Sequence, residues 1–281
     1  MTYTRTITAG LLALGLSAAP GFAETIHTGV TNFTHDAPHR DRLVQTTLFY
    51  PGTDGGYPEW IGDNPVFKGV RVMRDLKPER SKHPLIIISH GSGGNAANLA
   101  WLAGRLAAQG FVVAIPNHQG STSADSTPET TIPAVWQRPA DMSSLIDALA
   151  ASPSASAMID TGDISALGFS LGGLTALSLA GAQVHAEKLA QYCEDDPGAM
   201  TCVWFEKGNP LIPGHVDLRQ IDKQRFEAKF LDPRIQRVVA IDPAFATTYD
   251  LTGLKQVTAK VQIINLGTGE AVSIGELAQT I

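Results

Sequence analysis

A serine set between two glycines is the feature of this sequence best suited to covalent chemistry. The frame is Gly168-Phe169-Ser170-Leu171-Gly172, at the end of the apolar run ISALGF and before the helical pattern LGGLTALSLAGA. A serine hydroxyl becomes an effective nucleophile when it is held beside a base. A sharp strand-to-helix turn exposes the hydroxyl, and glycines on either side leave room for that turn. We therefore predict that Ser170 is a nucleophile, the alternative being a glycine-rich turn without a catalytic role.

A second glycine-rich turn, SHGSGG at residues 89–94, also lies between a predicted buried strand and a predicted helix. The backbone amides of Ser92 and of Leu171, the residue after the serine nucleophile, are the predicted oxyanion donors. His90 and Gly91 are predicted to line the site. Phosphate binding is the alternative for such a turn, but no lysine follows it as a P-loop would require.

Acyl transfer by a serine also needs an acid that orients the base. Asp242 follows the apolar run RVVAI at residues 237–241, so it is predicted at the carboxyl edge of a sheet, where such folds place their sites. There its carboxylate could accept a hydrogen bond from a histidine and fix the tautomer. A turn formed by Asp242 with Pro243 is the structural alternative, and Glu270 is the alternative acid.

The elements that must position these residues alternate along the chain. Apolar runs predict strands at 42–51, 84–89, 111–116, 164–169, 237–241 and 260–266. Helices are predicted for NLAWLAGRLAAQ, with Asn95 as cap and Gly110 as stop, for PADMSSLIDALAAS and for LGGLTALSLAGA. The stretch GTDGGYPEWIGDNP is predicted to be a loop. The pattern predicts an α/β fold with a mostly parallel central sheet and helices on both faces, interrupted at about 183–232 by a polar insertion that forms a partial cap.

These stretches resemble the α/β-hydrolase superfamily and, more narrowly, the secreted bacterial proteins called predicted dienelactone hydrolases, which are related to the platelet-activating-factor acetylhydrolases. The resemblance covers NPVFKG, PLIIISHGSGG, WLAGRLAAQGFVVAIPNHQGST, WQRPAD, LGFSLGG and LDPRIQRVVAIDPAF. It implies a serine esterase or lactone hydrolase that uses no metal or organic cofactor. It also implies that Asp242 is the acid and that His118 lines the site.

The histidine of the catalytic triad is not found where the resemblance places it. In this fold the order along the chain is serine, acid, histidine, and all eight histidines precede Asp242. The simplest explanation is a truncated chain that lacks a C-terminal strand and helix, and we expect such a chain to be nearly inactive. His118 is the first substitute base to test, whereas a swing of His215 from the insertion onto Ser170 has no support in the sequence. His35 and His39, in HDAPH, could pair on a metal, but their polar turn disfavours that. The alternative function is a non-catalytic binding protein on a hydrolase scaffold.

Composition and the N-terminus restrict the partners and the compartment. The 281 residues carry a net charge of −6 with no basic face, which disfavours nucleic acid binding. Residues 1–23 are predicted to be a signal peptide before a hydrolase domain at 24–281, so we expect a periplasmic or secreted protein without a later membrane span. In that compartment Cys193 and Cys202 are expected to form a disulfide rather than a zinc site. The expected partner is a small ester or lactone, and the sequence leaves the oligomeric state open.

Overall fold

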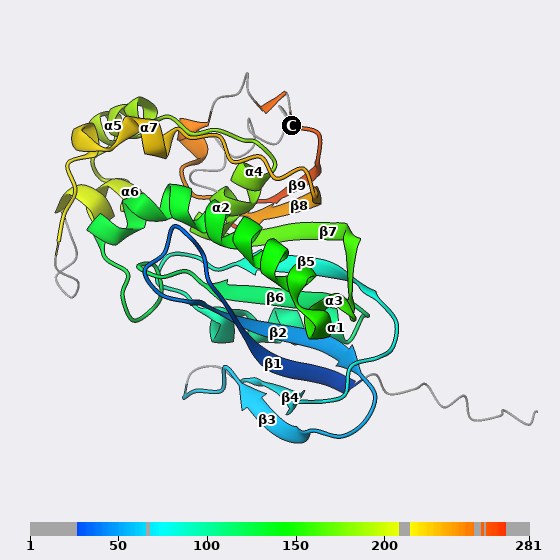
Figure 1. Cartoon of the computed structure of the whole chain (residues 1–281). Coiled ribbons are helices and arrows are strands. Elements are labelled where there is room, and N and C mark those ends of the chain that lie inside the picture. The colour runs from blue at the N-terminus through cyan, green and yellow to red at the C-terminus, as the bar shows by residue number, and fades with distance from the viewer. Residues whose placement is uncertain (1–26, 66–67, 208–213, 250–253, 256, 268–281) are drawn as a thin grey trace, which may run out of the picture.

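A computed structural model describes residues 27–65, 68–207, 214–249, 254–255 and 257–267, and these form a nine-stranded sheet (Figure 1). The strand order across the sheet is β3-β4-β1-β2-β6-β5-β7-β8-β9. The strands are β1 (His27–His35), β2 (Val44–Gly52), β3 (Tyr57–Ile61), β4 (Val70–Arg74), β5 (His83–Ser89), β6 (Val112–Asn117), β7 (Ile159–Phe169), β8 (Ile235–Ile241) and β9 (Lys260–Ile264).

The pairing directions bring the ends of the functional strands to one edge. From β6 through β5, β7 and β8 to β9, every neighbouring pair is parallel. β2 pairs antiparallel with both β6 and β1. The predicted mostly parallel α/β sheet is therefore present, and the turns after β5, β7 and β8 lie at a common carboxyl edge.

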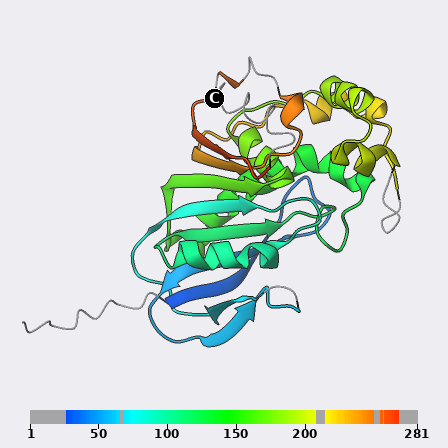
Figure 2. The same cartoon turned by 180° about the vertical axis from the view of Figure 1, so that it is seen from behind.

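Helices cover both faces of this sheet. In Figure 1 the long helix α2 crosses in front of the strands, and in Figure 2, seen from behind, α1 lies in front of them. The helices are η1 (Ala96–Leu99), α1 (Ala100–Ala107), α2 (Pro128–Ala151), α3 (Pro153–Ser156), α4 (Leu171–Leu179), α5 (Ala186–Asp195), α6 (Met200–Cys202), η2 (Val203–Lys207), η3 (Leu218–Gln220), α7 (Lys223–Phe226) and η4 (Ala246–Thr248). None of the helices in the described ranges has the length and hydropathy needed to cross a bilayer.

The continuous apolar run of β5 reflects this double cover. Ile86 and Ile88 pack in the cluster that includes the alanines of α1, and Leu85 and Ile87 pack in the cluster formed by α2 and α4. Since alternate side chains point to opposite faces, a strand buried on both sides must be apolar at every position. The same reason explains the runs of β6 and β7.

Two predicted boundaries were wrong. The stretch predicted as a loop contains β3, which pairs antiparallel with β4, and the pair is held by the Glu59–Arg74 ion pair at 2.5 Å. Helix α2 begins at Pro128 rather than at Pro139, because Thr127 forms a capping box at its start. Proline is well suited to the first helical position, so the helix begins before the apolar periodicity becomes visible.

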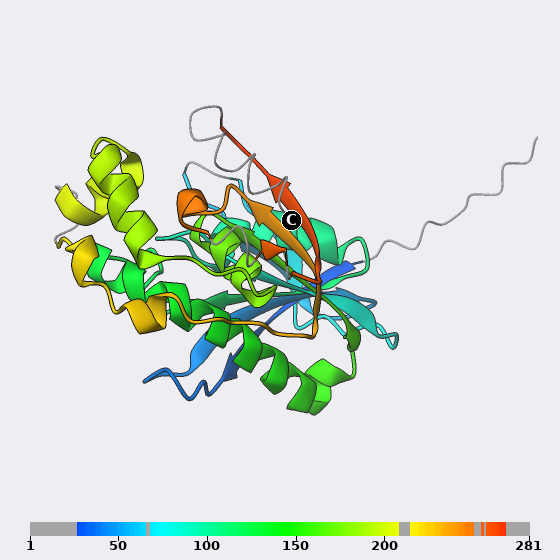
Figure 3. The same cartoon turned by 90° about the horizontal axis from the view of Figure 1, so that it is seen from above.

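The segment between α4 and β8 is a set of short helices beyond one end of α2 (Figure 3). The predicted disulfide is present and links Cys193 of α5 to Cys202 of α6, with a Cα–Cα distance of 5.3 Å. Phe205 and Phe226 of this segment pack against Phe245, with ring centroids 5.9 and 6.2 Å apart. The segment is thereby attached to the loop that follows β8.

Candidate active site

Ser170 occupies a strained turn between β7 and α4. Its backbone has φ +53° and ψ −120°, a conformation that is rare for a residue with a side chain and that concentrates at functional sites. A Cβ at Gly168 would lie 1.9 Å from the carbonyl oxygen of Gly172, and one at Gly172 would lie 1.9 Å from the carbonyl oxygen of Ser89. Both glycines are therefore required by backbone contacts, and the predicted strand-turn-helix context of Ser170 is present.

The turn that carries Asp242 lies against the strained strand-turn-helix segment at Ser170, which we call the elbow. The amide of Ser170 donates to the carbonyl of Ile241 at 2.9 Å, and the amide of Ala244 donates to the carbonyl of Ser170 at 3.0 Å. Asp242 has φ +47° and is half-buried. Its carboxylate makes no hydrogen bond or ion pair with another described residue. The structure therefore brings the predicted acid next to the predicted nucleophile, with its side chain available to a partner. The alternative acid, Glu270, lies outside the described residues.

The turn after β5 lies on the other side of Ser170. A Cβ at Gly91 would be 3.5 Å from the Cβ of Ser170, which is van der Waals contact, so this turn packs against the nucleophile. The backbone amides of Ser92 and Leu171 donate to no other described residue, and Leu171 is the first residue of α4. Free amides at a helix start carry a partial positive charge. The two predicted oxyanion donors are thus available to a ligand.

A buried charged network holds this turn in place. The guanidinium of Arg138 on α2 is fully buried and donates to the carbonyl of His90 at 2.5 Å and to the hydroxyl of Ser121 at 2.7 Å. One turn further along α2, the buried carboxylate of Asp141 accepts from Arg40 at 2.6 and 2.7 Å and from His118 at 2.8 Å. The contacts of Arg138 fix the turn after β5, which carries the Ser92 amide.

The two histidines of this network are neutral. Burial lowers the pKa of His118 to about 4 and that of His90 well below its usual value. Nδ1 of His118 donates to Asp141, which leaves Nε2 to accept from the Ser89 hydroxyl at 2.9 Å. Burial favours a higher pKa for Asp141, but hydrogen bonds from His118, His39 and Arg40 outweigh it and hold that pKa far below the usual range.

The side chains of His90 and His118, which were predicted to line the site, are buried. Their exposed fractions are 1% and 0%, so they support the turn from beneath and do not face a substrate. Because both ring nitrogens of His118 are already hydrogen-bonded, it is not the base. Gly91 is the one residue of the predicted lining that contacts Ser170.

The remaining described histidines have other partners or positions. His35 bonds Ser144 at 3.0 Å and His39 bonds Asp141 at 2.7 Å, so they are not a metal pair. His83 and His185 face Glu79 and Glu227, respectively, and His215 is exposed in the insertion. No hydrogen bond joins Ser170 to a histidine among the described residues. Within the same ranges, no cluster of three potential metal ligands occurs.

Sequence reasoning missed Arg40, Arg138 and Asp141 as parts of the site. The signal that could have found two of them is the spacing of Arg138 and Asp141, three residues apart, but the predicted helix began at Pro139 and left Arg138 outside it. Both face the sheet, where a charged residue is rare unless it is paired. Arg40 carried no such signal, because its partner lies 101 residues away.

Comparisons with known proteins agree with this architecture. A family profile described as serine aminopeptidase, S33, matches residues 80–192, which include the turn after β5 and Ser170. The structure is similar to a ferulic acid esterase from Streptomyces cinnamoneus, with a TM-score of 0.59, 19% identity and coverage of 93% of this chain and 72% of that one. No curated protein matches the sequence.

Two further similar structures are an esterase and a hypothetical protein. The esterase, from Pyrobaculum calidifontis, has 17% identity, a TM-score of 0.38 and coverage of 76% of this chain and 45% of that one. The hypothetical protein, from Pseudomonas aeruginosa, has 15% identity, a TM-score of 0.40 and coverage of 89% and 51%. This chain spans about half the length of those two proteins. The first structural match shows that this chain shares its fold with that esterase, and the family profile covers the part of the fold that carries Ser170.

Proposed function

We propose that this α/β-hydrolase-fold chain is a serine esterase that cleaves carboxylic esters or lactones through an acyl-enzyme. The observation that carries the proposal is the strained elbow of Ser170, with φ +53° between two glycines that backbone contacts require. Strain of this kind persists only where the surrounding structure imposes it, and a packing role would not need it.

The proposed reaction uses groups at the carboxyl edge of the sheet. The Oγ of Ser170 attacks the ester carbonyl carbon and its proton passes to a histidine base. The amides of Ser92 and Leu171 donate to the oxyanion of the tetrahedral intermediate. Asp242 orients the base and stabilises its charged form. The alcohol leaves with a proton from the base, and water then releases the acid from Ser170.

A second function follows from one observation. Because no described histidine is hydrogen-bonded to Ser170, a non-catalytic binding protein that retains the hydrolase scaffold is the competing proposal. It predicts an inert Ser170, whereas the esterase proposal predicts a serine that reacts with an active-site probe. Ser170 reactivity therefore separates the two functions without knowledge of the natural substrate.

The experiment is labelling with a fluorophosphonate, followed by peptide mapping and by hydrolysis of short p-nitrophenyl esters. In a chain that includes the histidine base, the probe should label Ser170, and Ser170→Ala should abolish labelling and reduce ester turnover by about 10³-fold or more. Ser154→Ala, at an exposed serine of α3, is the matched control and should behave like the parent chain. Absence of labelling at Ser170 in a chain with that base, or turnover retained in Ser170→Ala, would reject the esterase.

The narrower parts of the proposal rest on the sequence. A lactone as one substrate and membership of the dienelactone hydrolase group rest on the resemblance, and export after cleavage of residues 1–23 rests on the signal-peptide pattern of the N-terminus. The disulfide between Cys193 and Cys202 supports export, because such bonds persist in oxidising compartments. Detection of the processed chain in a periplasmic or culture fraction, with a new N-terminus at Glu24, would test export.

A further inference from the structure

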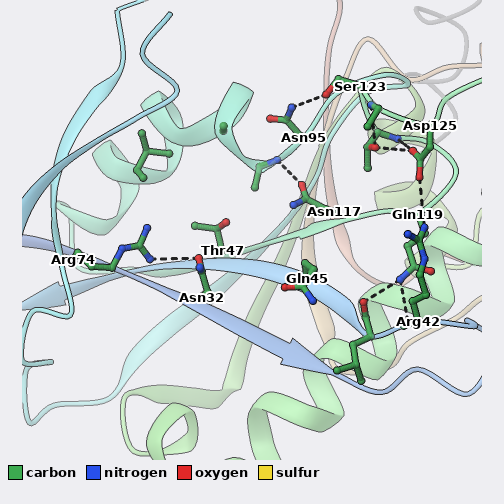
Figure 4. Close-up of a pocket in the computed structure, with 16 residues that line it drawn as sticks. Asn32, Arg42, Gln45, Thr47, Arg74, Asn95, Asn117, Gln119, Ser123 and Asp125 are labelled. Carbon is green, nitrogen blue, oxygen red and sulfur yellow. Dashed lines mark hydrogen bonds and ion pairs between the residues drawn. The ribbon is translucent and has the colours of Figure 1, made fainter.

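A groove of about 820 Å³, with polar side chains along its floor and apolar surface beside them, lies next to the turn after β5 at residues 89–94, which we call the oxyanion turn (Figure 4). It lies on the face of the sheet that α1 covers. Its floor is formed by the strands β1, β2 and β6, and its wall by the start of η1 and the loop after β6. Ser170 does not line it. This volume is typical of pockets that hold small molecules, and the proposed esterase reaction makes no use of it.

The floor of the groove is polar where the same face of the sheet is otherwise apolar. Phe49 and Ile115 pack under α1, and two residues further towards the carboxyl edge the same faces present Thr47 and Asn117. On β1, Val30 is likewise followed by Asn32 on that face. Alternate residues of a strand share a face, so each strand changes from apolar to polar where the helix no longer covers it.

The charged side chains of the lining already have partners. Arg74 donates to both oxygens of Glu59 at 2.5 and 3.0 Å. Asp125 accepts from the hydroxyl and amide of Thr122 at 2.6 and 2.8 Å. Arg42 is 3.9 Å from Asp125 and its side chain is 72% exposed. A strongly charged ligand would therefore meet groups whose charges are largely neutralised.

The neutral groups of the lining, by contrast, have free donors and acceptors. Gln45 and Thr47 make no hydrogen bond through their side chains to another described residue, and Figure 4 draws both on the strand floor without a partner. Asn117 accepts from the amide of Ala96 through Oδ1, which leaves its Nδ2 free to donate. Gln119 donates through Nε2 to two backbone carbonyls, which leaves its Oε1 free to accept. Hydroxyl groups both donate and accept, so they match this set.

We propose that this groove binds a neutral polyhydroxylated ligand of the size of a mono- or disaccharide. Its amides and the Thr47 hydroxyl bond the ligand's hydroxyl groups. Ile61 and Leu43, the latter 51% exposed, provide apolar surface for its C–H groups. The proposal concerns binding alone and does not depend on hydrolysis at Ser170.

The wall of the groove is continuous with the oxyanion turn. Gly94 and Thr122 form an isolated parallel β-bridge. The amide of Ser123 donates to the Gly94 carbonyl at 3.1 Å, and the side chain of Asn95 donates to the Ser123 hydroxyl at 2.9 Å. β6 lies two strands from β7, which is about 10 Å at the usual strand spacing. A bound sugar would therefore lie at the same edge of the sheet as Ser170. It would contact the side of the oxyanion turn that faces away from Ser170.

The experiment is titration of the native chain with xylobiose, cellobiose and maltose, followed by side-chain amide NMR signals. At least one of these sugars should shift the signals of Asn32, Gln45 and Asn117. The Gln45→Ala/Thr47→Val variant should bind it roughly ten-fold more weakly, the equivalent of two ordinary hydrogen bonds. Thr47→Val alone removes one hydroxyl with little change of shape, and it should give a smaller loss if the double variant is unstable.

The controls separate this proposal from its competitors. Gln224→Ala/Thr258→Val changes the same residue types at exposed positions outside the groove and should leave the affinity unchanged. Ser170→Ala should also bind like the native chain, so loss of esterase activity would not count against the groove. Three results would overturn the proposal: no sugar shifts these signals, the double variant binds as well as the native chain, or inorganic phosphate displaces the sugar in a salt-dependent manner, which would indicate an anion site.

Discussion

Replacement of Asp141 by asparagine should be among the most destabilising single changes in the described part of the chain. Each carboxylate oxygen accepts two hydrogen bonds: Oδ1 from His39 and Arg40, and Oδ2 from Arg40 and His118. In either orientation an asparagine NH₂ group would face an N–H of Arg40. The substitution therefore removes a buried charge and adds a donor-to-donor contact.

The magnitude follows from the burial of this carboxylate. Asp141 is fully buried, and removal of one partner from a buried ion pair costs about 3–5 kcal/mol, because the other charge remains in a poorly solvating site. A domain of this type has about 5–15 kcal/mol of stability in total. Asp141→Asn should thus lower the urea midpoint strongly. It should also slow fluorophosphonate labelling of Ser170, because His118, whose amide donates to the His90 ring in the oxyanion turn, loses its charged partner.

Asp147→Asn is the matched control on the same helix. Its carboxylate is 71% exposed and pairs with Arg234 at the surface, where an ion pair contributes at most about 1 kcal/mol. Urea unfolding of both variants and of the native chain, with labelling rates measured in parallel, makes the comparison. A loss below about 1 kcal/mol for Asp141→Asn would refute the account of the buried network.

Three further predictions follow from the same structure. Gly172→Ala should abolish labelling of Ser170 and reduce soluble yield, since its Cβ would lie 1.9 Å from a backbone oxygen; normal labelling would contradict this. The free energy of unfolding should fall as the pH drops from 6.5 towards about 4, because unfolded His118 binds a proton in that window while the folded imidazole, with its pKa lowered to about 4, does not. The slope approaches about 1.4 kcal/mol per pH unit, and equal urea midpoints near pH 7 and pH 5 would exclude it. A Cys193→Ser/Cys202→Ser variant should lose about 2–3 kcal/mol of stability, measured by urea unfolding against the oxidised native chain, and two alkylatable thiols in the native chain would show that no disulfide forms.

The sequence by itself determined the parts of the fold that are encoded locally. The six segments predicted as strands all overlap strands of the sheet. The runs of β5 and β6 were visible because a strand buried on both faces must be apolar at nearly every position. The elbow was visible because its two glycines flank Ser170 within five residues. The disulfide was visible from two cysteines in a short loop with a predicted signal peptide ahead of it.

Only the tertiary structure decided what surrounds that elbow. Arg138 bonds the oxyanion turn directly and Asp141 supports it through His118. Arg40, which donates two hydrogen bonds to Asp141, is 101 residues away from it. His118, a candidate base from its place after a strand, became a buried neutral group because the fold closes over it and occupies both ring nitrogens. The polar groove likewise depends on where α1 stops covering the sheet. Local patterns specify which residues can form a strand or a turn, but burial and long-range pairing set their charge and access, and those depend on segments that only folding brings together.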